Sequence, residues 1–163
     1  MNRRKIFNVS AVAALGLALL PSSVVAQQKS LKEQVFGTWS ITSVFDHYED
    51  GKKEATFGVG VKGALSFDGN GRFMWTIIGE KRAELKSDDP RRPDAFIVAY
   101  IGTYAVEGNV IKMHAERAQN SARDGADMTF TVTGSGDALT LVGSSRKDLK
   151  GTFTPHLDVA RAK

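Results

Sequence analysis

From residue 37 to the C-terminus, apolar and polar residues alternate with a period of two, which is typical of β-strands that bury one face. In one such stretch, Met128, Phe130 and Val132 alternate with three threonines. The pattern predicts eight strands, at residues 37–46, 62–68, 72–79, 96–106, 109–117, 126–133, 138–144 and 151–160.

Short sequences rich in glycine, asparagine and aspartate separate several of these strands. Residues 68–71, 107–109 and 134–137 are of this kind, and each is typical of a tight turn. Strands joined by such turns pair antiparallel in chain order. Closing eight of them on themselves removes the exposed sheet edges. We therefore expect an all-β fold, an eight-stranded antiparallel up-and-down barrel, with a two-sheet sandwich as the alternative.

The apolar face of each strand is assigned to the barrel interior. On the first strand this assignment puts Trp39, Ile41 and Phe45 together. The fourth strand, residues 96–106, is apolar on both faces. Its outer face is therefore expected to be covered by the short N-terminal helix or by a partner chain, the latter giving a homodimer through this strand.

The residues before the first strand predict that short helix. Ser30 and Glu33 have the spacing of a capping box, and Leu31 and Val35 lie on one face of the turn that follows. Gly37 ends it. A helix this short needs a packing partner, so we expect it to lie against one end of the barrel.

The first 26 residues have the features of a cleavable signal peptide. Arg3, Arg4 and Lys5 precede an apolar stretch, and small residues at 24–26 suggest cleavage after Ala26. The paired arginines also resemble a twin-arginine signal. A retained membrane anchor is the alternative, but the apolar stretch is shorter than the roughly 20 residues that a span needs. The prediction is a single domain at residues 27–163, exported to the periplasm or secreted, without an integral membrane segment after cleavage.

Charge and cysteine content exclude several classes of function. The chain has 22 basic and 18 acidic residues, a net charge of +4, of which three basic residues lie in the leader. The remaining +1, without a basic stripe interleaved with aromatics, does not indicate a nucleic-acid partner. The absence of cysteine excludes disulfides, a thiol nucleophile and a lipid-modified N-terminal cysteine.

Few residues suggest catalysis. His47, His114 and His156 lack metal-site spacing, and no nucleotide fingerprint is present, so no catalytic residue, metal or cofactor is predicted. His114 is assigned to the outer face, although a register slip of one residue would turn it inward as a general base. The charged connection at residues 81–94 is interpreted as a solvated loop or as a lid over one mouth of the barrel.

A set of short motifs resembles the bacterial lipocalin-like domain family. The order runs from Gly37-Thr38-Trp39, through residues 62–67 and 68–73, to the block at 99–104 and the closing residues 159–162. The resemblance extends over Leu31 to Ala162 and implies a barrel with an internal cavity. It also implies that Arg161 lies over Trp39 as a structural contact. Lys112 stands where family members commonly have histidine, which argues against a functional histidine carried over from the family and leaves His114, two residues on, as no more than a candidate substitute.

The predicted function is the binding of a small apolar or amphipathic ligand inside the barrel. The hydroxyls of the two tyrosines on the fourth strand are either ligand contacts or ordinary packing groups. One alternative is a cofactor-free isomerase, cyclase or hydrolase that uses His114 or a tyrosine. Another is an envelope interaction protein with a filled barrel, acting through the fourth strand or the 81–94 loop. The candidate ligand-binding residues are Phe73, Trp75, Tyr100, Tyr104, Met113, Met128 and Phe130.

Overall fold

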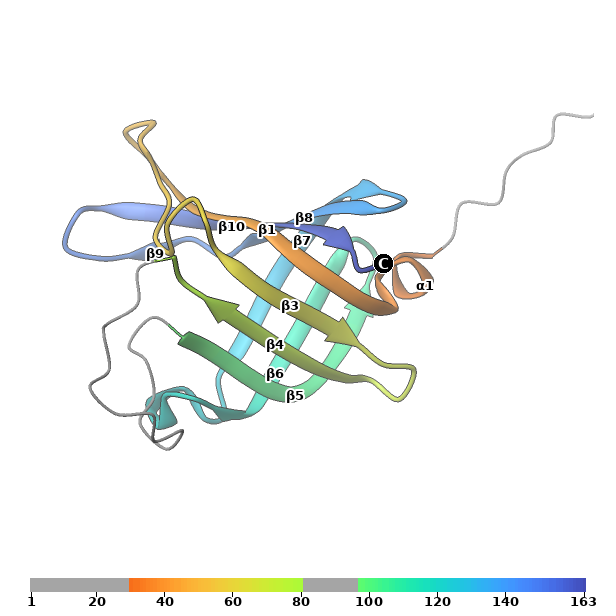
Figure 1. The fold of residues 1–163 in the computed structure, drawn as a ribbon. Helices are drawn as coiled ribbons and strands as arrows, with labels where there is room; N and C mark the ends of the chain where they lie inside the picture. Colours follow the sequence, from red (N-terminus) through yellow and green to blue (C-terminus); the bar gives the residue numbers. More distant parts are fainter. Residues whose placement is uncertain (1–29, 81–96) are drawn as a thin grey trace, which may run out of the picture.

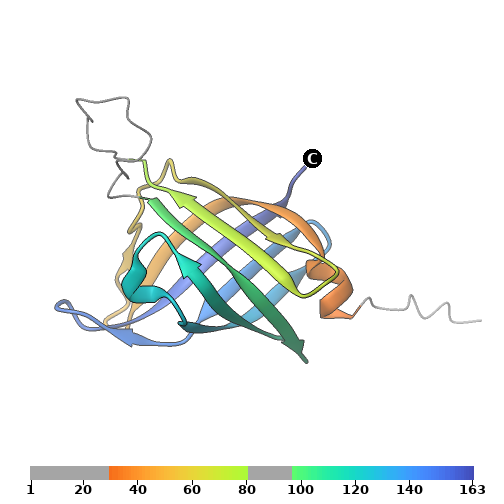
Figure 2. The same cartoon turned by 90° about the horizontal axis from the view of Figure 1, so that it is seen from below.

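Eight long strands pair in chain order, and the last returns to the first to close an antiparallel barrel. This arrangement comes from a computed structural model, which describes residues 30–80 and 97–163 (Figures 1 and 2). The elements are α1 (Leu31–Val35), β1 (Gly37–Tyr48), β2 (Lys53–Glu54), β3 (Lys62–Phe67), β4 (Arg72–Ile78), β5 (Ile97–Glu107), β6 (Val110–Ala118), a 3-10 turn η1 (Ser121–Arg123), β7 (Asp127–Ser135), β8 (Ala138–Gly143), β9 (Arg146–Lys147) and β10 (Thr152–Arg161).

The eight long strands are those that the sequence predicts, and the barrel rather than the sandwich is confirmed. Closure depends on β1 and β10, which pair from Trp39 opposite Arg161 to Tyr48 opposite Phe153. Two short strands were not predicted. β2 extends the β1 edge and β9 pairs with β10, and both lie at the end of the barrel away from α1 (Figure 1).

The inner face of β1 differs from the prediction in its second half. Pairing with β10 passes from Ile41 directly to Ser43, so Thr42 is an extra residue that forms a β-bulge. After the bulge, the even-numbered residues point inward in place of the odd-numbered ones. Val44 is therefore buried, whereas Phe45 is only half-buried. The prediction that Phe45 shares the inner face with Trp39 and Ile41 is therefore wrong, because a bulge leaves no period-two signature in the sequence.

A second bulge brings two backbones into close approach at β5 and β6. Gly102 pairs with Ala115 and Ile101 with Arg117, which leaves Glu116 as the extra residue. A Cβ atom placed on Gly102 would lie 1.9 Å from the carbonyl oxygen of His114. Only glycine fits there, because that oxygen belongs to the backbone and cannot rotate away.

The helix α1 lies against one end of the barrel, as expected. Val35 is fully buried, and its carbonyl accepts a 2.7 Å hydrogen bond from the Trp39 indole N–H. The Arg161 guanidinium stacks over the Trp39 ring at 4.3 Å, which confirms the contact implied by the family resemblance. The chain enters β1 through Gly37 at φ +108°, a conformation that other residues rarely adopt. This end of the barrel is closed.

The interior is filled near α1 and along its middle. Tightly packed side chains there include Leu65, Phe67 and Ile111, each at most 2 % exposed. No helix within residues 30–80 and 97–163 is both long and apolar enough to cross a membrane.

The outer face of the β4–β5 pair remains open to solvent within the described residues. Met74 and Ile101 are opposite one another in the pairing and are 59 % and 42 % exposed. The expectation that both faces of this strand are buried is therefore wrong at Ile101, and α1 lies at the barrel end instead. The homodimer through this strand stays a prediction. Phe96 and the 81–94 loop, with its interpretation as a lid, fall outside the described residues.

Candidate functional site

A cavity of about 250 Å³ opens at the end of the barrel opposite α1. Its wall combines the second half of β1, the end of β4 and the first residues of β5, β7 and β10, with η1, β9 and the loop after β2 at the rim. Its lining residues are Val44, Asp46, Thr56, Phe57, Trp75, Ile77, Val98, Tyr100, Arg123, Met128, Phe130, Arg146, Phe153, Pro155, His156 and Leu157.

Three aromatic rings pack against one another in the cavity wall. Trp75 meets Phe130 edge-on at a centroid distance of 5.6 Å and lies at the same distance from Tyr100 in a tilted arrangement. Phe130 is 3 % exposed and Met128 4 %. Such close ring contacts fix the aromatic side chains in place, so the wall is formed before any ligand arrives.

The Trp75 indole N–H lacks a hydrogen-bond partner. The side chain is 8 % exposed, and its Nε1 atom is the one buried side-chain nitrogen or oxygen among the described residues without a partner. Trp39 is different, since its N–H is bonded to Val35. An unpaired buried donor costs about 1–3 kcal/mol, so the Trp75 N–H favours an incoming acceptor.

Charged groups gather at the rim. The Asp46 carboxylate accepts a hydrogen bond from the Thr56 hydroxyl. Arg123, on η1, and Arg146, on β9, supply two guanidinium groups. His156 stacks on Phe45 with ring centroids 4.8 Å apart. Desolvation, reinforced by nearby His47, lowers the pKa of His156. The rim is thus mixed in charge above an apolar interior.

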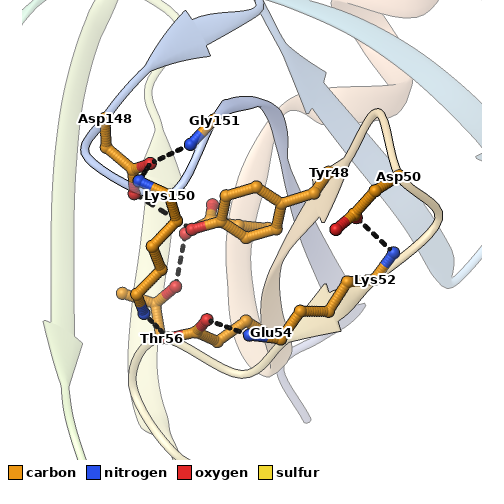
Figure 3. Close-up of polar contacts among 9 residues, drawn as sticks. Tyr48, Asp50, Lys52, Glu54, Thr56, Asp148, Lys150 and Gly151 are labelled. Atoms are coloured by element: carbon orange, nitrogen blue, oxygen red, sulfur yellow. Dashed lines mark hydrogen bonds and ion pairs between the residues drawn. The ribbon is translucent and has the colours of Figure 1, made fainter.

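A hydrogen-bond network fixes two loops beside this rim (Figure 3). Tyr48 donates to Asp148 at 3.0 Å, and Glu54 is paired with both Lys52 and Lys150. Desolvation and the Asp148 carboxylate raise the pKa of Tyr48 to about 12. The donated bonds from both lysines lower the pKa of Glu54. The network joins the β1–β2 hairpin to the loop before β10 and so holds that side of the opening.

Four of the seven candidate ligand-binding residues lie together on the cavity wall: Trp75, Tyr100, Met128 and Phe130. The other three, Phe73, Met113 and Tyr104, are buried but do not line it. The Tyr104 hydroxyl donates to the carbonyl of Asp68 at 2.7 Å, and burial raises its pKa. Its geometry is that of a packing tyrosine at the β3–β4 turn.

His114 lies on the outer face, as its position in the alternation predicts. Its side chain is 50 % exposed, and its Nδ1 atom is 2.8 Å from a carboxylate oxygen of Asp127. The register slip that would turn it inward does not occur, so the hypothesis of His114 as a buried general base is wrong. Within the described residues, no group of three or more histidine, aspartate or glutamate side chains could hold a metal ion.

Sequence reasoning missed several residues of the rim. Asp46 faces the cavity only because of the bulge at Thr42, and Arg123 and Arg146 belong to short elements without periodicity. The sequence feature that could have indicated the turn carrying Arg123 is Asn120, whose side chain caps η1. The Asx cap predicts a turn there, although not which way the arginine points.

Comparisons with known proteins found a matching family model and a similar solved structure. The model of the lipocalin-like domain family matches residues 36–153. A solved structure of a lipocalin-like protein from Bacteroides uniformis ATCC 8492 is similar at 17 % identity and a TM-score of 0.43, over 78 % of this chain and 98 % of that one. No curated protein matches the chain.

The family match extends over most of the barrel, from the residue before β1 into β10. The chain therefore belongs to the lipocalin-like domain family. This confirms the resemblance drawn from the Gly37-Thr38-Trp39 motif and the block at residues 99–104.

Proposed function

We propose that this protein is an exported carrier or receptor that binds a small apolar or amphipathic molecule in the open-end cavity. The observation that carries the proposal is the contrast between the two ends of the barrel. One end is sealed by Trp39, Val35 and Arg161, whereas the other contains a cavity with an aromatic wall. Apolar cavities with a few polar groups are the usual form of small-molecule sites.

The size of the cavity limits its occupant. A volume of about 250 Å³ equals that of roughly eight water molecules in the liquid. It lies just below the range of roughly 300–1,000 Å³ that encloses drug-sized ligands. We infer that the cavity holds one ring system or a short acyl chain, and that a longer ligand extends past the rim.

Export is supported by the sequence of the leader alone. The basic residues at 3–5, the apolar stretch after them and the small residues at 24–26 are those of a signal peptide. On this proposal, residues 27–163 are the mature protein, and the ligand is one met in the periplasm or outside the cell.

Filling the cavity tests the proposal. Val98 lies on the wall, and Val98→Phe should lower the affinity for the neutral fluorescent probe N-phenyl-1-naphthylamine at least about tenfold, because the added ring occupies ligand space. The measurement is a fluorescence titration of the purified mature protein.

The matched control is Ile101→Phe on the outer face of the same strand, where the added ring enters solvent. Its affinity should stay within twofold of the parent. Equal affinities for the parent and the Val98 variant would contradict binding in this cavity, as would no binding of the probe to the parent.

A further inference from the structure

We propose that the ligand carries an anionic head group, held at the cavity mouth by Arg123 and Arg146. This inference rests on the proposed function, because it names the ligand class for the same cavity. The described residues include five arginines, which differ in whether a carboxylate is paired with them. Three of the five have carboxylate partners: Arg72 with Glu116 at 2.6 Å, Arg117 with Asp124 at 3.4 Å and Arg161 with Asp137 at 3.0 Å.

The remaining two are Arg123 and Arg146, and both line the cavity. Neither guanidinium group forms an ion pair or a hydrogen bond with any residue in the described parts of the chain, although both backbones are hydrogen-bonded. Arg123 is half-buried as a residue, and Arg146 is exposed. Two unpaired guanidinium groups at one opening match the planar, two-oxygen geometry of a carboxylate, sulfate or phosphate.

The uncharged polar groups of the wall also favour a ligand rich in acceptors. The Trp75 N–H is buried without a partner, and the Tyr100 hydroxyl makes no hydrogen bond to any described residue. Both can donate. An amphiphile that enters tail first would lay its apolar part on Phe130 and Met128, and its head group would remain at the rim.

One negative group opposes this arrangement. Asp46 is the only acidic residue among the described residues that line the cavity, and the Thr56 hydroxyl already donates to its carboxylate. His156, which also lines the cavity, has its pKa lowered by desolvation and so tends toward the neutral form. Among the described lining residues, two arginines against one aspartate give a net positive charge.

The test compares ligands that share a tail and differ in the head. Octanoate, octyl sulfate and 1-octanol each compete with N-phenyl-1-naphthylamine for the parent protein and for the double variant Arg123→Gln/Arg146→Gln. Octanoate or octyl sulfate should bind the parent at least tenfold more tightly than 1-octanol, and the stronger of the two identifies the preferred head group. The double variant should lose that advantage while it binds 1-octanol within twofold of the parent.

Two further variants separate a site from a general charge effect. Arg117→Gln removes one positive charge from a residue that does not line the cavity, and it should leave all three affinities unchanged. Asp46→Asn should tighten octanoate binding severalfold, because it removes the opposing charge. If 1-octanol binds the parent as tightly as both anions, or the double variant keeps their advantage, the inference fails and the proposed function stands. If neither the fluorescent probe nor 1-octanol binds, the proposed function itself fails.

Discussion

Replacing Trp39 with alanine is expected to lower the free energy of unfolding by about 3–5 kcal/mol, the range for a fully buried large aromatic residue. Trp39 is 0 % exposed, donates to the Val35 carbonyl and lies under the Arg161 guanidinium. Its removal leaves a cavity, frees the Val35 carbonyl and takes away the ring on which the Arg161 guanidinium stacks. Urea denaturation followed by far-ultraviolet circular dichroism measures the loss.

The control for this prediction is Trp39→Phe. It keeps a buried ring under Arg161 but lacks the indole N–H, so it should cost clearly less, about 1–2 kcal/mol. Arg161 itself donates to the carbonyls of Gln34 and Phe36 at 2.9 and 3.1 Å, so it continues to hold the helix in this variant. Equal losses for the alanine and phenylalanine variants would show that the ring contributes nothing to closure.

Gly102→Ala is expected to cost about 3 kcal/mol or more, at or above the top of the usual range for overpacking. The new Cβ would lie 1.9 Å from the His114 carbonyl oxygen, so β5 and β6 must separate at the bulge. The same denaturation experiment measures the effect.

Gly108→Ala is the comparison for that variant. At Gly108 φ is +59°, and nothing lies within 4 Å of an added Cβ. The substitution there costs only the left-handed conformation, about 1–2 kcal/mol. A smaller loss at Gly102 than at Gly108 would contradict the close approach of the two backbones.

Most of the barrel could be predicted from the sequence because its signals are local. Period-two alternation and tight turns marked all eight long strands, and the capping box marked α1. The error at Phe45 has a physical cause: the extra residue Thr42 is accommodated by pairing with β10, more than 100 residues away. Register across such a separation is a tertiary property that local alternation does not encode.

The candidate site was predicted only in part for the same reason. Trp75 and Phe130 were found because they occupy inward positions of regular strands. Whether an inward residue packs in the filled part or borders the cavity depends on its height along the barrel axis, and this is why Tyr104 and Tyr100 differ. The arginines of the rim lie on short irregular elements, where side-chain direction follows from loop geometry alone.

The proposed function places the ligand beside Trp75 in the open-end cavity. The two tryptophans of the chain allow a direct measurement, because Trp75 lines the cavity and Trp39 does not. Single-tryptophan variants Trp39→Phe and Trp75→Phe are titrated with 8-bromo-1-octanol, whose bromine quenches fluorescence at close range. We expect strong quenching of Trp75 in the first variant and several times weaker quenching of Trp39 in the second. Equal quenching of both, or quenching of Trp39 alone, would contradict this placement.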